Sequence, residues 1–265
     1  MADPSTVREL LAATSVPADL VDEVLEAAPS WLVGADAEVV AAEVVLCHPP
    51  LADAEVRAVA APAGAGTHRL TVVAADRPGL LAGTAGVLAA EGASVRDATT
   101  VVLPHRRLGL QRVEVGGDGL DDAAWERIGG RLRDVLGGGL EVTTGWRPSH
   151  PVTVETQPQG DGRLVLAVRA PDQPGLLHAA ASWLAGQGCS IVSCSATSER
   201  GWASDVFVVD GDADPAAFAA VLGGGPTATG HGGFHVVRVA ADAALFPWRV
   251  AAAAARAVGR ADTAR

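Results

Sequence analysis

The sequence has no lysine, no tyrosine, four phenylalanines and three cysteines, and no unbroken apolar run of membrane-spanning length. All 20 of its basic side chains are therefore arginines, set against 31 aspartates and glutamates, and the formal net charge is −11. Nucleic acids and anionic membranes are bound by concentrated basic faces, and the sequence shows no such cluster. We therefore expect no nucleic-acid partner and no membrane partner.

The three cysteines are Cys47, Cys189 and Cys194, which form neither an even disulfide set nor a metal-binding pattern. Free cysteines of this kind usually act as small buried apolar side chains in a reducing compartment. The N-terminus carries an early acid and lacks the apolar core of a signal peptide. We therefore expect a cytoplasmic protein with no metal and no cofactor.

The sequence repeats itself with a shift of 96 residues. DRPGLL at 76–81 falls on DQPGLL at 172–177, and the register holds without a gap from 56–95 to 152–191, with 17 of 40 positions identical. The matches include prolines and glycines that punctuate turns, which biased composition alone would not bring into register. The sequence therefore predicts two copies of one structural unit.

Each copy shows the same order of elements. A short extended run (56–60; 152–156) precedes a Pro/Gly turn, an apolar strand (70–75; 164–170), the D-x-P-G turn and a helix that ends at a glycine. Two strands follow (94–103 and 108–115; 190–197 and 202–209), then a second helix (121–136; 215–222) and a closing strand (140–144; 234–240). This order predicts an α+β fold of two tandem βαββαβ modules, ferredoxin-like, each with an antiparallel sheet and two helices on one face.

We divide the chain accordingly into four parts. Residues 1–51 are expected to be a helical N-terminal segment, 52–147 the first module with its leading strand, and 148–241 the second module with its leading strand. Residues 242–265 are expected to form a C-terminal helix or tail.

The two D-x-P-G turns are the candidate ligand sites. A helix N-terminus offers unpaired N–H groups and a partial positive charge to a carboxylate, while glycine lets a ligand approach the backbone closely. The turn aspartate could receive the ammonium group of a zwitterion; alternatively, it merely caps the helix. The residues concerned are Asp76, Arg77, Pro78, Gly79, Leu80 and Leu81 in the first copy and Asp172, Gln173, Pro174, Gly175, Leu176 and Leu177 in the second.

The D-x-P-G-L-L turn between a strand and a helix, followed by G-x-S-[VI], resembles the ACT domain, a ligand-sensing module of amino-acid metabolism. The stretch APDQPGLL…GQGCSIVSCSATSERGWASDVFVVD is similar to the paired ACT domains that end the bacterial PII uridylyltransferase/uridylyl-removing enzymes. The resemblance covers about residues 52–240. It implies a small amino-acid ligand, with glutamine favoured, bound at module interfaces, and it favours a ligand role for the turn aspartate in at least one copy.

The resemblance also implies a second polar contact at Ser94 or Ser190, although a serine there could equally bond to the backbone. Asp205 shares the apolar face of its strand with Phe207, and Gln111 takes its place in the first copy if the preceding turn there is two residues longer. A carboxylate on an apolar face needs a backbone donor or a ligand amine, and structural satisfaction is the more common outcome.

The catalytic motifs of those enzymes are not found in this sequence: there is no G-S followed by D-x-D and no paired His-Asp. We therefore predict a regulatory amino-acid-binding protein rather than an enzyme, one that forms a homodimer and signals to an unknown protein partner. The alternative is a scaffold in which the modules serve only for dimerisation, without a ligand.

Overall fold

The computed structural model describes residues 2–27, 29–32, 35–64, 66–117, 119–138, 140–142, 144, 146–147, 152–159 and 162–223. The C-terminal tail expected at 242–265 and the closing strand expected at 234–240 lie outside the described residues.

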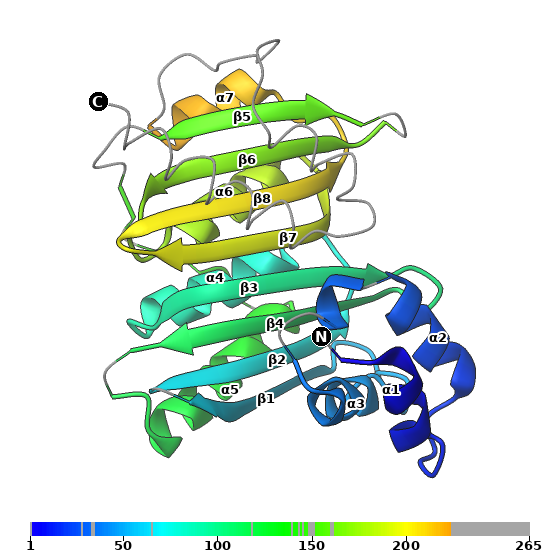
Figure 1. The fold of residues 1–265 in the computed structure, drawn as a ribbon. Coiled ribbons are helices and arrows are strands. Elements are labelled where there is room, and N and C mark those ends of the chain that lie inside the picture. The colour runs from blue at the N-terminus through cyan, green and yellow to red at the C-terminus, as the bar shows by residue number, and fades with distance from the viewer. Residues whose placement is uncertain are drawn as a thin grey trace.

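The two copies fold with the same order of elements, as Figure 1 shows. In the first copy these are β1 (Val56–Gly64), β2 (Thr67–Ala75), α4 (Leu80–Ala90), β3 (Ser94–Leu103), β4 (Leu108–Gly116) and α5 (Asp122–Leu136). In the second they are β5 (Thr153–Pro158), β6 (Leu164–Pro171), α6 (Leu176–Gly186), β7 (Ser190–Glu199), β8 (Trp202–Asp210) and α7 (Pro215–Val221). The expected α+β class with antiparallel strands is confirmed.

The closing strand expected at residues 140–144 is wrong: residues 140–142 and 144 belong to no strand. The edge of β2 that such a strand would need is already taken by β1, which pairs along it from Val56 opposite Ala74 to Gly64 opposite Thr67. The leading strand β5 holds the same place beside β6. Each copy thus completes four strands with the strand that precedes it, joined by a short turn as a hairpin.

The two four-stranded sheets join into one, in the order β1-β2-β4-β3-β7-β8-β6-β5. The junction is an antiparallel pairing of β3 with β7, from Asp97 opposite Thr197 to Val101 opposite Ser193. Thr99 pairs with Ser195, its own counterpart in the repeat, so a pseudo-twofold axis passes between these two residues. Helices α4 and α6 pack against each other across the same junction.

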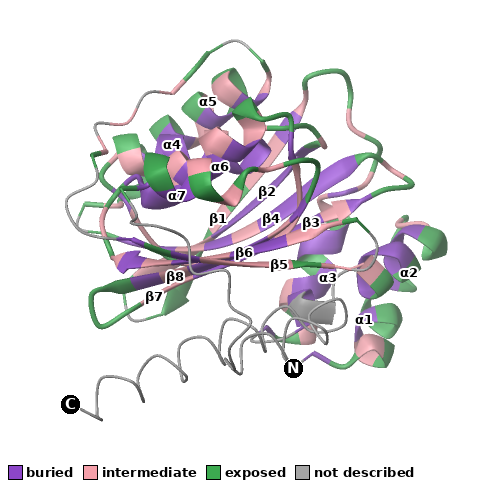
Figure 2. Cartoon of the chain, turned by 90° about the horizontal axis from the view of Figure 1, so that it is seen from above, coloured by how far each residue is buried: buried purple, intermediate pink, exposed green. Residues whose placement is uncertain are grey.

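Helices cover both faces of the sheet, as Figure 2 shows. Helices α4 to α7 lie on one face, where they bury the main core of the two copies. The N-terminal helices α1 (Pro4–Leu11), α2 (Ala18–Ala27), η1 (Pro29–Leu32) and α3 (Ala37–Val45) lie on the other face, against the first copy. There they bury the apolar side chains that β2, β3 and β4 turn away from the main core, such as Val73, Val101 and Leu110.

A buried ion pair fastens the N-terminal helices to the sheet. The guanidinium of Arg112 on β4 donates two hydrogen bonds to the Glu43 carboxylate on α3 and lies 4.4 Å from the ring centroid of Trp31. The same carboxylate accepts hydrogen bonds from Trp31 Nε1 at 2.6 Å and Thr71 Oγ1 at 3.1 Å. Glu43 is 3% exposed, and these donors offset the cost of removing its charge from water.

We expect Glu43→Ala to lower the free energy of unfolding by about 3–5 kcal/mol, because it leaves the Arg112 charge buried without its partner. Urea unfolding followed by circular dichroism measures the change. The control is Asp22→Ala, which breaks the exposed Arg8–Asp22 pair and should cost less than about 1 kcal/mol. Equal losses in the two variants would contradict a fastening role for Glu43.

Candidate functional site

Both D-x-P-G turns place a glycine, not the aspartate, at the helix N-cap. Gly79 has φ of 88° and Gly175 has φ of 92°, in the left-handed region that favours glycine, and neither α4 nor α6 has a side-chain cap. Asp76 and Asp172 therefore do not cap their helices, which removes the capping alternative. Their carboxyl groups are left for other contacts.

Each turn aspartate is tied to the hairpin of its own copy. The Asp172 N–H donates to the carbonyl of Gly201 at 2.9 Å, and its carboxylate accepts a hydrogen bond from Ser198 Oγ. In the first copy the Asp76 N–H donates to the carbonyl of Arg107 at 2.8 Å. Burial raises the pKa of Asp76, and a hydrogen bond from the Arg77 backbone opposes that shift.

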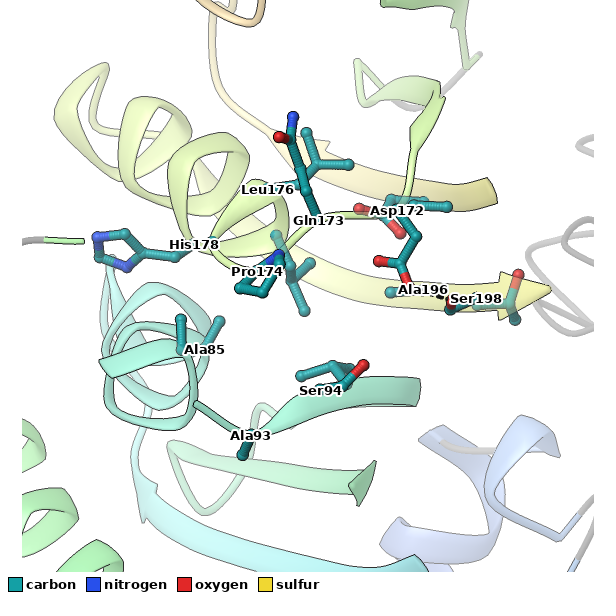
Figure 3. Close-up of a pocket in the computed structure, with 17 residues that line it drawn as sticks. Ala85, Ala93, Ser94, Asp172, Gln173, Pro174, Leu176, His178, Ala196 and Ser198 are labelled. Carbon is teal, nitrogen blue, oxygen red and sulfur yellow. Dashed lines mark hydrogen bonds between the residues drawn. The ribbon is translucent and has the colours of Figure 1, made fainter. Parts of the chain in front are cut away.

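A cavity of about 80 Å³ lies where the second-copy turn meets the first copy, as Figure 3 shows. The turn and the start of α6 line one side, the end of α4 and the start of β3 line another, and β7 and β8 complete it. Ser94 of the first copy faces the turn that carries Asp172 and Pro174. We call this cavity the inter-copy pocket; it is smaller than the roughly 300–1,000 Å³ typical of drug-sized ligands and fits a small molecule. The residues predicted from the sequence that line it are Ser94, Asp172, Gln173, Pro174, Gly175, Leu176, Leu177 and Asp205.

Asp205 is the buried acid of the inter-copy pocket. It lies on β8 between Val168 of β6 and Ala196 of β7, and it is 3% exposed. Within the part of the chain that the structure describes, its carboxyl group has neither a hydrogen bond nor an ion pair. Burial, and then the negative charge of Asp172, raises the pKa of Asp205 to about 7. A buried acid of this kind is characteristic of functional sites.

Gln111 occupies the same place in the first copy. It lies between Val72 and Thr100, the repeat counterparts of the two neighbours of Asp205, so the expected equivalence holds. Its side-chain oxygen accepts a hydrogen bond from Thr84 Oγ1 on α4 at 2.7 Å. The counterpart of Thr84 is Ala180, which has no hydroxyl to offer Asp205.

The first-copy turn encloses much less space, a cavity of about 20 Å³. Among the predicted residues it is lined by Asp76, Arg77, Gly79, Leu80 and Leu81, together with Gln111. Ile191 of the second copy lines it, whereas Ser190 lines neither this cavity nor the inter-copy pocket. Pro78 lines a separate open groove beside α5.

Arg77 makes a contact that its sequence position does not indicate. Its guanidinium donates to the carbonyls of Val135 and Leu136 at the end of α5. A cation at this place satisfies terminal carbonyls and complements the helix dipole. Gln173, the counterpart of Arg77, lines the inter-copy pocket instead.

His178 lines the inter-copy pocket, although a histidine directly after the P-G-L-L turn is more often a surface helix residue than a ligand contact. Its Nδ1 lies 2.8 Å from the carbonyl oxygen of Ala82, the repeat counterpart of His178, so the contact bridges α6 and α4. Gly86 makes room for the imidazole, because a Cβ there would lie 2.6 Å from Nδ1. Ser198 was missed, although its place near the β7–β8 turn, close in space to Asp172, follows once the hairpin register is known.

No group of three or more acidic, histidine or cysteine side chains is placed to hold a metal ion among the described residues. None of the helices in the described ranges is both long and apolar enough to span a bilayer. Cys47, Cys189 and Cys194 are all free and buried.

No protein-family profile matches the sequence. The chain is 31% identical over 174 residues to the bifunctional uridylyltransferase/uridylyl-removing enzyme of Gluconobacter oxydans (strain 621H). The resemblance drawn from the motifs is confirmed. This match covers 54% of the chain and 17% of the enzyme, so the chain spans about a sixth of that relative's length.

Two solved structures show lower similarity. Aspartate kinase from Synechocystis has a TM-score of 0.38 and 16% identity, covering 59% of this chain and 26% of the kinase. An unknown protein from Galdieria sulphuraria has a TM-score of 0.24 and 19% identity, covering 54% of this chain and 81% of that protein.

The raised pKa of Asp205 predicts a pH-dependent stability of the ligand-free protein. Between pH 4 and 7 the folded chain keeps a proton that the unfolded chain, with an ordinary pKa of 3.8, has already lost. Stability should therefore fall as pH rises through this window, by up to about 4 kcal/mol relative to Asp205→Asn, and be level above it. Urea unfolding of both proteins at stepped pH measures the difference, and parallel profiles would contradict the assignment.

Proposed function

We propose that this chain is an amino-acid-binding regulatory protein and that its ligand occupies the inter-copy pocket. The observation that carries the proposal is the meeting, in one small cavity, of a helix N-terminus, the Ser94 hydroxyl and a buried carboxyl group that has no hydrogen-bond partner among the described residues. The helix N-terminus suits the carboxylate of an amino acid, and the acid suits its ammonium. The first-copy turn residues Asp76, Arg77, Gly79, Leu80 and Leu81 line the smaller second site of the same proposal.

Glutamine is the amino acid that we propose first. Gln173 lines the pocket, and its amide is of the type that both donates and accepts hydrogen bonds, as recognition of an amide side chain requires. Thr197 and Ser198 also line the pocket; their hydroxyls donate to the Ser204 carbonyl and to Asp172, and their oxygens keep acceptor capacity. The chain matches only 17% of an enzyme that transfers and removes uridylyl groups, and the catalytic motifs of such enzymes are not found in this sequence. The partial match therefore supports a regulatory rather than a catalytic role for the part that matches. The response would pass to a protein partner.

Ser94→Leu should abolish stabilisation by the ligand, because the added bulk fills the wall of the inter-copy pocket. Ser190→Leu makes the same change at the repeat counterpart, which lines neither the inter-copy pocket nor the first-copy cavity, and should leave stabilisation intact. Ligand at a hundred times its dissociation constant should stabilise a responsive protein by about 2.7 kcal/mol.

Thermal-shift measurements on both variants, with glutamine and then the other amino acids, test this expectation. If the native chain responds to none of the twenty, the protein is the ligand-independent scaffold. If Ser190→Leu loses the response and Ser94→Leu keeps it, the site is in the other copy.

We also propose that the chain forms a homodimer. Among the described strands, β1 and β5 each pair along one edge only, and Val59 on β1 is 47% exposed. Open edges of this kind favour association with a second chain. Light scattering at micromolar concentration should give about twice the 26.7 kDa of one chain, and a monomeric mass would contradict the proposal.

A further inference from the structure

We propose that Asp205 binds the ammonium group of the ligand, so that the inter-copy pocket accepts only ligands with a primary amine and releases a proton when it fills. This inference rests on the proposed function and specifies the chemistry of the same site. It assigns the role to a strand residue outside the D-x-P-G turn.

Two acids line the pocket, Asp172 and Asp205, and their contacts indicate which of them binds the ligand ammonium. The Asp172 carboxylate already accepts a hydrogen bond from Ser198 Oγ on strand β7 of the same copy. Asp205 is more deeply buried, and no described side chain or backbone group donates to it. A buried carboxyl group without a donor is costly, and a ligand ammonium would supply up to three N–H donors and a compensating charge. The pocket therefore lacks the group that an amine would bring.

The first copy carries a different side chain at the same position, and there the side-chain oxygen has a donor, whereas Gln111 Nε2 is buried without a partner among the described residues. A neutral amide stands there in Gln111, and Thr84 one turn into α4 donates to its oxygen. In the second copy both members of this pair are changed, to Asp205 and Ala180. The change removes the internal donor and adds an acid at the larger of the two cavities. The two copies thus provide a matched comparison: the first has an amide whose oxygen accepts from Thr84, and the second has an acid without that donor.

The ligand's other end has a place in the same pocket. Helix α6 begins at Leu176, and the N–H groups of its first turn have no acceptors within the helix. These groups and the positive end of the helix dipole favour a carboxylate. An amino acid can therefore place its carboxylate at the turn and its ammonium at Asp205.

The surroundings of Asp205 explain why a proton is released when the ligand binds. The titratable groups that act on it are Asp172 from the turn and Cys194 from β7, whereas the ring of His178 on α6, which lines the same pocket, contacts Ala82 of α4. Burial and the Asp172 charge hold the pKa of Asp205 near 7, so at neutral pH about half of the empty sites carry a proton there. An ammonium group at hydrogen-bond distance favours the ionised carboxylate, and the proton leaves as the ligand binds. Affinity should therefore rise with pH, approaching tenfold per pH unit below about pH 6.5.

Isothermal titration with L-glutamine, and with the other nineteen amino acids if glutamine gives no heat, tests the inference. Each amino acid that binds is compared with its counterpart lacking the α-amine; for glutamine this is glutaramic acid. Titrations in phosphate and in Tris at pH 7 count the protons released, because the two buffers differ in ionisation heat. We expect proton release, at least tenfold weaker binding of the counterpart without the amine, and at least tenfold weaker binding to Asp205→Asn, which keeps the side-chain shape.

Two further variants exchange the donor found in the first copy. Ala180→Thr brings the first-copy hydroxyl to Asp205 and should weaken binding at least tenfold, whereas Thr84→Ala makes the opposite change in the first copy and should leave it unaltered. Circular dichroism establishes that each variant is folded. If amino acids bind but Asp205→Asn keeps full affinity and no protons are released, this inference is overturned and the proposed function stands. If none of the twenty binds, the proposed function fails and this inference with it.

Discussion

The pairing of β3 with β7 is the interaction on which the rest of the structure depends. Either copy alone would leave one edge of its sheet open and would hold half of a pocket. Pairing Thr99 with its counterpart Ser195 sets the register, and the register brings the turn of each copy against the first residues of the inner strand of the other. Ser94 meets the Asp172 turn, and Ile191 meets the Asp76 turn, for this reason. The proposed ligand site is thus a property of the junction between the copies.

The backbone keeps the twofold relation, whereas the side chains depart from it. In the first copy Thr84 donates a hydrogen bond to the Gln111 oxygen, whereas in the second copy Ala180 has no hydroxyl to donate to Asp205. The Arg77 guanidinium contacts the end of α5, whereas its counterpart Gln173 lines the inter-copy pocket. The buried Glu43–Arg112 pair likewise belongs to the first copy, because Val206 stands where the repeat would require Arg112. One copy holds the N-terminal helices, and the other offers the larger cavity.

The repeat explains how much of this could be predicted. Prolines and glycines fall in register in both copies, so the strands, both turns and the equivalence of Gln111 with Asp205 followed from the sequence. The strand expected at 140–144 failed because its apolar residues gave a local pattern, whereas the place it required was already filled by β1. Contacts between distant elements, such as Arg77 with α5 and Asp172 with Ser198, depend on tertiary packing, and no local pattern encodes that packing.

Strand β3 links the proposed site to the N-terminal helices. Ser94 at its beginning lines the inter-copy pocket, and Leu103 at its end is buried under the N-terminal helices. The turn after Leu103 is bound to α2, where Glu23 accepts a hydrogen bond from the His105 N–H at 2.8 Å and Arg106 pairs with Asp19 at 2.6 Å. β3 is hydrogen-bonded to β4 along its length, with a bulge between Val95 and Asp97, and to β7 from Asp97 to Val101. One strand, shared by the two halves of the sheet, therefore connects the lining of the inter-copy pocket with the turn that contacts α2.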